Sequence, residues 1–131
     1  AMIDLNNFKL VNDKLGHQVG DSLLIDFART LKKSIRDSDG LYRLGGDEFL
    51  VALINCNLEQ SQIWKNQLLK EIPTLLSTNK AINQLERPVG VSVGIIKCGN
   101  ETVEQMLERA DKAMYCDKQA QRLANNLQVC S

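Results

Sequence analysis

The chain has 131 residues, of which 44% are hydrophobic and 24% are charged, a composition typical of a single globular domain with one core. Lysine plus arginine and aspartate plus glutamate number 16 each, so the formal net charge is zero and no partnership with nucleic acid or anionic lipid is expected. The sequence contains no apolar stretch long enough to span a membrane and no signal-peptide pattern, so we expect no membrane contact by this domain.

The first half of the chain predicts a short strand, a helix and a β-hairpin. The apolar residues 2–3 indicate the end of a strand. Residues 21–35 keep the apolar spacing of a helix, with Asp21 placed as its N-cap. The apolar runs 41–44 and 50–54 then predict a hairpin, whose second strand is apolar on both faces, as an inner strand of a covered sheet would be.

The second half predicts a helix, a loop and a strand. Residues 57–77 keep helical spacing, although Pro73 should kink or shorten this helix. Residues 78–87 are polar and predict a loop. Residues 89–96 predict a strand, in which the glycines indicate close packing or the approach of a ligand.

The last element is a helix that begins after a capping box of Thr102 and Gln105. Its apolar residues, which we expect to face the core, are Val103, Met106, Leu107, Ala110 and Met114. Strands and helices in this order predict an α/β fold of the α+β sandwich type, with a mixed or antiparallel central sheet flanked by helices.

Four cysteines lack the Cys-x-x-Cys spacing of zinc and redox motifs, and the chain contains a single histidine. Their wide separation offers no paired ligands. We therefore expect free thiols in a reducing cytosol, rather than zinc ligands or disulfides, at Cys56, Cys98, Cys116 and Cys130.

The most informative segment is the turn of the hairpin, which contains Gly45, Gly46, Asp47 and Glu48. A glycine pair can supply the positive φ angles of a tight two-residue turn and lets a ligand approach the backbone. Taken alone, such a pair is an ordinary turn far more often than a binding loop. Two carboxylates where a strand should be apolar are costly unless a cation or water meets them, so this turn favours a site for phosphate and metal.

A third carboxylate, Asp4, follows the first apolar run. It is far from Asp47 in sequence, but the two would be neighbours if the first strand pairs with the hairpin. Magnesium takes hard oxygen ligands, usually one or two carboxylates together with phosphate oxygens and water. An isolated Asp4 would be a strand-end or capping carboxylate, whereas Asp4 combined with the acidic turn favours a metal–nucleotide site.

Fixed spacings connect these segments over nearly the whole chain, from Asp4 to about Arg122. The matching positions before the hairpin are Asp4, Phe8, Lys9, Asn12, Asp13, Gly16, His17, Gly20, Asp21, Arg36 and Asp39, and Arg43 precedes the turn. This pattern closely resembles the GGDEF domain of diguanylate cyclases. The resemblance implies a palm-like nucleotide cyclase fold that condenses two GTP molecules into cyclic di-GMP and two pyrophosphates, with Mg²⁺ or Mn²⁺, as a homodimer.

The family's leading helix and the segment after it are absent here. We therefore expect residues 1–131 to form one GGDEF domain that is truncated at its amino terminus and belongs to a longer sensor protein. The resemblance implies a cytoplasmic location for the domain, in a full-length protein that could be membrane-anchored.

The resemblance also implies roles for the acidic residues. The metals would be held by Asp4, by the backbone carbonyl of Leu5 and by Asp47. Asp47 would further help to activate the 3′-hydroxyl that attacks the α-phosphate of a second GTP. Glu48 would complete the catalytic acidic pair.

Guanine presents N1–H and N2–H₂ as donors on its Watson–Crick edge, and a carboxylate such as that of Asp21 can accept both, whereas adenine presents an acceptor at N1. The resemblance assigns Asp21 and Asn12 to the guanine and sugar edge, with His17 nearby. Each residue also has a structural interpretation: Asp21 as a helix cap, Asn12 as a helix-end amide, and His17 as a loop residue after Gly16.

Phosphate contacts are implied at both ends of the chain. The backbone around Phe8 and Lys9 and the glycines of the turn could meet phosphate. On the last helix, Lys118 and Arg122 are four residues apart and share one face, which otherwise would be a solvated basic stripe. Gln121 departs from the family, which usually has glycine there, and a continuing helix could aim Arg122 differently.

Arg36 and Asp39 precede the acidic turn with Arg-x-x-Asp spacing. Alone they would be a surface ion pair of little consequence. In the resembling family this position is an inhibitory site, where Arg36 and Asp39 would bind the guanines of the product, cyclic di-GMP. Two alternatives to the enzyme remain: a non-catalytic module that binds GTP or cyclic di-GMP and signals to a partner, and a structural dimerisation domain, which leaves the acidic turn unexplained.

Overall fold

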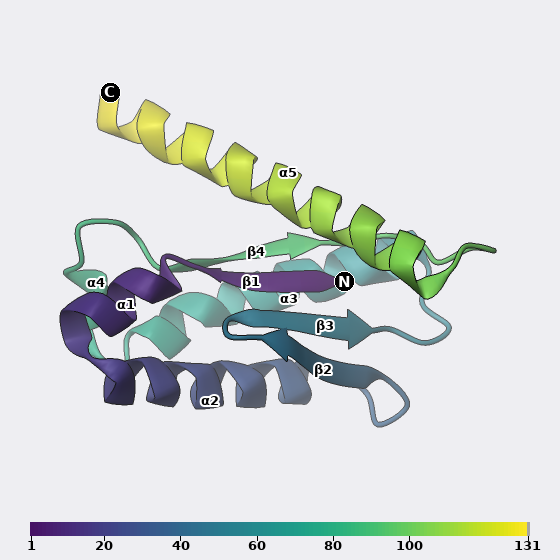
Figure 1. The fold of residues 1–131 in the computed structure, drawn as a ribbon, viewed down its shortest axis with the longest axis horizontal. Helices are drawn as coiled ribbons and strands as arrows, with labels where there is room; N and C mark the ends of the chain where they lie inside the picture. Colours follow the sequence, from purple (N-terminus) through teal and green to yellow (C-terminus); the bar gives the residue numbers. More distant parts are fainter. Residues whose placement is uncertain (131) are drawn as a thin grey trace.

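The computed structural model describes the backbone of residues 1–130 and the side chains of residues 1–124 (Figure 1). Its elements in chain order are β1 (Met2–Asn6), α1 (Phe8–Leu15), α2 (His17–Ser34), β2 (Gly40–Gly45), β3 (Glu48–Ala52), α3 (Leu58–Leu76), α4 (Lys80–Asn83), β4 (Gly90–Gly94) and α5 (Val103–Cys130).

The four strands form one sheet in the order β2-β3-β1-β4, and every pairing is antiparallel. β1 is an inner strand, so Asp4 lies opposite Glu48 of β3 on one side and opposite Ser92 of β4 on the other. β3 is also an inner strand, as its two-sided apolar pattern predicted. The predicted α+β sandwich with an antiparallel sheet is confirmed.

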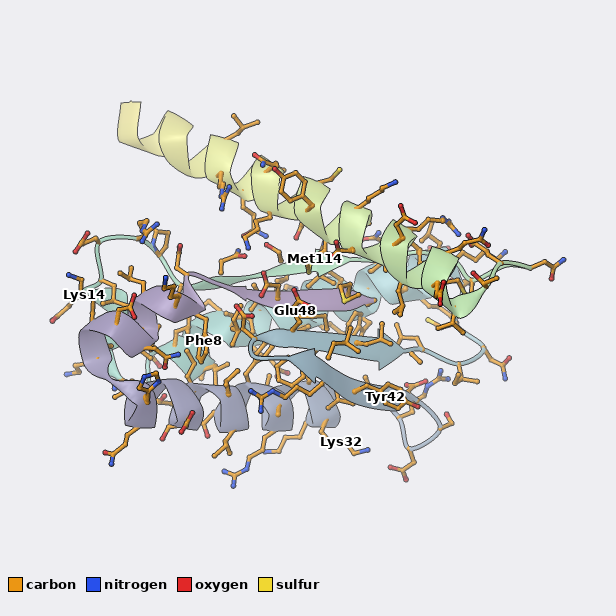
Figure 2. The ribbon with its side chains drawn as sticks, viewed as in Figure 1. Phe8, Lys14, Lys32, Tyr42, Glu48 and Met114 are labelled. Atoms are coloured by element: carbon orange, nitrogen blue, oxygen red, sulfur yellow. The ribbon has the colours of Figure 1, made fainter. Side chains whose placement is uncertain are left out.

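The two faces of the sheet are covered differently. Alternate residues of β1, Ile3 and Leu5, are fully buried in the main core together with apolar side chains of α1, α2 and α3. The alternating residues Met2 and Asp4 face α5, where Met2 packs with Ala110 and Met114. Figure 2 shows Met114 directed from α5 toward β1. The sheet therefore places Asp4 on the face that α5 covers.

α5 approaches β4 very closely at Gly94. A Cβ atom at this position would lie 2.1 Å from the backbone nitrogen of Met114 and 2.6 Å from the carbonyl oxygen of Ala110. Real Cβ atoms do not make such contacts, so any side chain at Gly94 would push the helix away from the sheet. The predicted close packing at the glycines of this strand is confirmed here.

Several predicted boundaries were wrong. α2 begins at His17, after Gly16 with φ 91°, so Asp21 lies within the helix and is not its N-cap. By contrast, the predicted helix 57–77 is confirmed as α3, which continues through Pro73 to Leu76, so the proline shortens it little. The predicted loop contains α4, where the Asn79 side chain accepts a hydrogen bond from the Ala81 amide.

Other predictions, on helix caps and on the side chains of α5, were confirmed in part. The predicted capping box of Thr102 and Gln105 is confirmed. Asn57 and Gln60 form a second capping box, at the start of α3, which was not predicted. Val103, expected to face inward, is exposed. Among the described residues, no helix is long and apolar enough to cross a membrane. Three cysteines are free, whereas the side chain of Cys130 lies outside the described residues.

Candidate functional site

The hairpin turn lies one residue later than the glycine pair suggested. Gly45 pairs with Glu48, and an irregularity in the register between Arg43 and Gly45 leaves Gly46 and Asp47 as the turn. The predicted positive φ angles at Gly45 and Gly46 are wrong, because among the described glycines only Gly16 has one. No atom lies within 4 Å of a Cβ built at either glycine, so the backbone of the turn is open to a ligand.

Arg43 supports this turn in a way that the sequence did not reveal. Its guanidinium donates hydrogen bonds to the carbonyl oxygen of Gly46, at 2.7 Å from Nη2 and 3.2 Å from Nε. These bonds satisfy a turn carbonyl from within the hairpin. The acidic residue that follows is therefore held on a braced turn.

β1 and the turn meet where Asp4 and Asp47 converge. The backbone amide of Leu5 donates to the carbonyl oxygen of Asp47 at 3.3 Å, which brings the turn against the end of β1. Burial, together with the negative charges of Asp4 and Glu48, raises the pKa of Asp47 to about 6. Figure 2 shows Glu48 at the start of β3 beside β1. The predicted convergence of these acids is thus present.

Asp4 is buried, and its two carboxylate oxygens have different surroundings. Oδ2 accepts a hydrogen bond from Nζ of Lys118 on α5 at 2.9 Å. Oδ1 is buried and has no hydrogen-bond partner. Leaving a buried charged oxygen unpaired is costly, which favours the approach of a cation to this side of the carboxylate.

The residues at this site fit a magnesium or manganese ion that arrives with a nucleotide. Among the residues whose side chains are described, no three histidine, cysteine, aspartate or glutamate side chains form a metal cluster. The chain offers the carboxylates of Asp4 and Asp47, with the Leu5 carbonyl on the same strand edge as the amide that meets Asp47. Magnesium usually takes one or two carboxylates and completes its shell with phosphate oxygens and water.

A polar pocket of about 210 Å³ lies beside Asp4, between the amino-terminal end of α1 and α5. Both Lys118 and Arg122 line it, as their shared helix face predicted, together with Asn6, Asn7, Pro88, Gly90 and Gln121. Phe8 is buried, whereas Lys9 is exposed on the first turn of α1. First-turn amides have no partner within their helix, so the amides of Phe8 and Lys9 are suited to an anion.

The residues predicted to contact guanine lie on α1 and α2, which follow each other without a loop. His17 is the first residue of α2 and Asp21 is one turn further along, and both are exposed. Asn12 on α1 has a buried Oδ1 atom without a hydrogen-bond partner. A Cβ atom at Gly20 would lie 1.8 Å from this oxygen, so Gly20 makes room for the Asn12 carboxamide.

Arg36 and Asp39 form a second, separate cluster at the other end of α2. The Asp39 carboxylate accepts hydrogen bonds from the backbone amides of Arg36 and Ile54, each at 2.9 Å, and from the Arg36 guanidinium at 3.2 Å. Burial opposes ionisation of Asp39, but these hydrogen bonds outweigh it and lower its pKa. The guanidinium also donates to the Ile54 carbonyl and remains largely exposed. The pair therefore joins the end of α2 to the end of β3.

Solved structures that share this antiparallel α+β fold include a GGEEF domain of a diguanylate cyclase. The family described as "Diguanylate cyclase, GGDEF domain" matches residues 1–124, and the chain belongs to this family.

Known proteins with these features are similar over most of the chain. Diguanylate cyclase DgcS of Shewanella oneidensis is 36% identical over 123 residues, which are 92% of this chain and 39% of that protein. The crystal structure of diguanylate cyclase SiaD from Pseudomonas aeruginosa, solved with its activator SiaC, is 31% identical with a TM-score of 0.77 and covers 91% of this chain and 45% of that one. The active GGEEF domain of a Vibrio cholerae diguanylate cyclase is 27% identical with a TM-score of 0.73, covering 91% and 74%.

The curated relatives are longer proteins. The chain spans 39% of the Shewanella protein, and smaller shares of two other relatives, 16% and 11%. Activities and partners of the complete proteins therefore belong to the proposals that follow.

Proposed function

We propose that this domain is a diguanylate cyclase, which condenses two GTP molecules into cyclic di-GMP and two pyrophosphates. The observation that carries the proposal is the pair of Asp4 and Asp47, in which a buried, unpartnered carboxylate oxygen lies beside a second acid whose pKa is raised to about 6. Such an arrangement is unfavourable by itself and becomes favourable when a cation enters. Perturbed acids of this kind are typical of functional sites.

In this proposal Asp4, Asp47 and the Leu5 carbonyl hold Mg²⁺ or Mn²⁺. The bound ion would neutralise the triphosphate and help to ionise the attacking 3′-hydroxyl. Without a metal ion the pKa of Asp47 is about 6, so at neutral pH its carboxylate would be largely ionised and able to hold the cation. Glu48, opposite Asp4 in the sheet, adds to the negative field that binds the cation.

The pocket beside Asp4 would take the triphosphate. Lys118 and Arg122 line it and supply positive charge. The first-turn amides of Phe8 and Lys9, which follow the lining residue Asn7, would supply neutral donors. The open backbone at Gly45 and Gly46 allows the nucleotide to pass close to the turn. Before nucleotide binds, Lys118 neutralises Asp4.

The base would be read at the junction of α1 and α2. Asp21 is exposed, so its carboxylate is free to accept from N1–H and N2–H₂ of guanine, with Asn12 and His17 at the same junction. An adenine would present an acceptor to this carboxylate. The domain should therefore prefer GTP to ATP.

The proposed reaction needs two copies of the domain, because each would hold one GTP and each hydroxyl attacks the other nucleotide. We also propose product inhibition at Arg36 and Asp39, supported by the exposure of the Arg36 guanidinium, which suits stacking and hydrogen bonding to a guanine. Both Asp39 oxygens are already engaged, so a direct contact of product with Asp39 requires one of its present hydrogen bonds to open.

A second candidate function is a non-catalytic module that binds GTP or cyclic di-GMP and signals to a partner. The ion pair between Lys118 and Asp4 favours it, because it gives the carboxylate a counter-ion from within the protein. Such a module would bind nucleotide without consuming it.

The deciding experiment is incubation of the domain with GTP and Mg²⁺, followed by mass spectrometry for cyclic di-GMP, with ATP as the comparison substrate. Cyclic di-GMP from GTP, and no cyclic product from ATP, is the expected result. Calorimetry on the Asp21→Ala variant should show that much of the preference for GTP over ATP is lost. GTP binding without any turnover would favour the non-catalytic module.

A further inference from the structure

Gln121 occupies a position on α5 between the two basic residues of the polyphosphate pocket. It follows Lys118 by one turn of the helix and directly precedes Arg122, and all three line that pocket. Its side chain, unlike that of the exposed Arg122, does not extend into solvent. It is half-buried between α5, the end of β1 and β4.

Both the oxygen and the nitrogen of the Gln121 carboxamide form hydrogen bonds. Nε2 donates to the carbonyl oxygen of Val91 on β4 at 2.9 Å and to Oδ2 of Asp117 at 3.0 Å. Oε1 accepts from Nδ2 of Asn6, the last residue of β1, at 3.0 Å. One side chain thus connects α5 to β1 and β4, which lie side by side in the sheet (Figure 1). Residues at the ends of both strands line the pocket.

The partners of Gln121 are themselves fixed. Oδ1 of Asn6 accepts a hydrogen bond from the fully buried Ser92 at 2.8 Å. Asp117 accepts from the backbone amide of Val93 at 2.8 Å and forms an ion pair with Lys65 of α3 at 3.3 Å. A glutamine held on both sides by anchored groups loses its rotational freedom, and the helix backbone that carries it is held as well.

We propose that Gln121 is a positioning residue, which holds α5 against β1 and β4 and thereby sets Lys118 and Arg122 for a polyphosphate ligand. The inference rests on the proposed function, in which this pocket takes the triphosphate. A small residue at this position would leave the Asn6 amide without its acceptor and the Val91 carbonyl without this donor. Lys118 and Arg122 would then depend on the rest of α5 for their placement.

The test measures binding of tripolyphosphate with Mg²⁺ by calorimetry on the 131-residue domain. Gln121→Met keeps the volume and helix propensity of the side chain but removes all three hydrogen bonds. Gln121→Glu keeps the shape but replaces the donor by a carboxylate next to Asp117. Gln119→Ala is the matched control, since Gln119 is on the same helix and, among the described side chains, bonds to Tyr115 one turn earlier.

Both Gln121 variants should bind tripolyphosphate about tenfold more weakly, a change that corresponds to about 1.4 kcal/mol. Guanosine affinity should be unchanged in them, and Gln119→Ala should bind both probes as the wild type does. A residue that only stabilises the fold would lower the melting temperature and leave the tripolyphosphate affinity of the folded domain unaltered. That result in either folded variant overturns the inference.

The outcome can be separated from that of the proposed function. If the wild type binds no tripolyphosphate, the pocket is not a polyphosphate site and the inference is wrong, whatever the turnover assay shows. If the variants lose tripolyphosphate affinity but the wild type makes no cyclic di-GMP from GTP, the positioning role stands and the cyclase proposal fails.

Discussion

Asp4 and Asp39 are both buried carboxylates, 6% and 8% exposed, and each is paired with one basic side chain, yet their surroundings differ in two respects. Asp39 has partners for both oxygens, and no acid among the described residues perturbs its pKa. Asp4 has an unpartnered oxygen and lies beside Asp47. Burial with an ion pair therefore does not distinguish a candidate site from a structural joint. The unsatisfied oxygen and the neighbouring acid do.

The strongest test of this difference removes the acids of the turn. Asp47→Ala or Asp4→Asn should abolish cyclic di-GMP formation, by about a hundredfold or more, because a metal ligand contributes several kcal/mol of charge stabilisation in the transition state. Initial rates with GTP and Mg²⁺ measure it, and circular dichroism checks the fold. Near-normal turnover in either folded variant would remove the metal assignment.

Removal of the Asp39 carboxylate, in which both oxygens have partners, should lower stability instead. Asp39→Ala leaves the amide of Ile54 and the guanidinium of Arg36 without their acceptor, and we expect it to lower the free energy of unfolding by about 2 kcal/mol. Urea denaturation measures it, with the exposed neighbour in Asp37→Ala as the control. Equal midpoints for the two variants would show that the Asp39 contacts contribute little to stability.

Arg36 allows the ligand role of this cluster to be separated from its structural one. Because Arg36 is exposed and distant from the acidic turn in the proposal, Arg36→Ala should weaken cyclic di-GMP binding about tenfold and relieve product inhibition, with initial GTP turnover largely unchanged. Arg29→Ala, also exposed on α2, is the control. Unchanged product affinity in the Arg36 variant would reduce the cluster to a structural ion pair.

The smallest expected effect is on the pH dependence of stability. The pKa of Asp47 is raised from 3.8 to about 6, so between these values the folded domain holds a proton that the unfolded chain has released, and this residue makes stability fall as pH rises. Asp39 acts in the opposite direction: its pKa is lowered, so its contribution is present above pH 3.8 and is lost as pH falls through the lowered value.

Asp47→Asn should therefore gain stability over the wild type as pH rises from about 4 to above 6. The gain should be about 1 kcal/mol, well below the full value of a two-unit shift, because solvent screens this partly exposed turn. Melting temperatures of both proteins across this range measure it. A difference that stays constant with pH would show that Asp47 has no raised pKa.

The sequence predicted the fold wherever apolar spacing was regular. Leu23, Phe27 and Leu31 of α2 are all buried, and the hairpin strands pair as expected. It failed where polar residues form the first turn of a helix: α2 starts at His17, which carries no apolar signal, so Asp21 was taken for the cap. α4 was missed because a single buried residue, Ile82, anchors it.

The candidate site was predictable in part for a related reason. Carboxylates within apolar strand sequences are unusual, so the sequence alone indicated that Asp4 and the acids of the turn belong together. The pairing of β1 with β3 brings Asp4 to the hairpin turn. The contact of Lys118 with Asp4 joins residues 114 positions apart and depends on how closely α5 packs on Gly94. The room that Gly20 leaves for Asn12 likewise depends on how α1 and α2 pack together, which no local pattern encodes.

β4 is an outer strand of the sheet. Gln121 and two other side chains bind backbone groups at its outer edge, which has a consequence for solubility. Val91 and Val93 alternate with the residues that hydrogen-bond to β1, so their backbone groups point away from the sheet. Gln121 occupies the Val91 carbonyl, Asp117 the Val93 amide and Lys65 the Val93 carbonyl. Free groups in such a row would serve as a template for a strand from another molecule. Here another strand would first have to displace three side chains from two helices, which protects this side of the sheet from aggregation by strand addition.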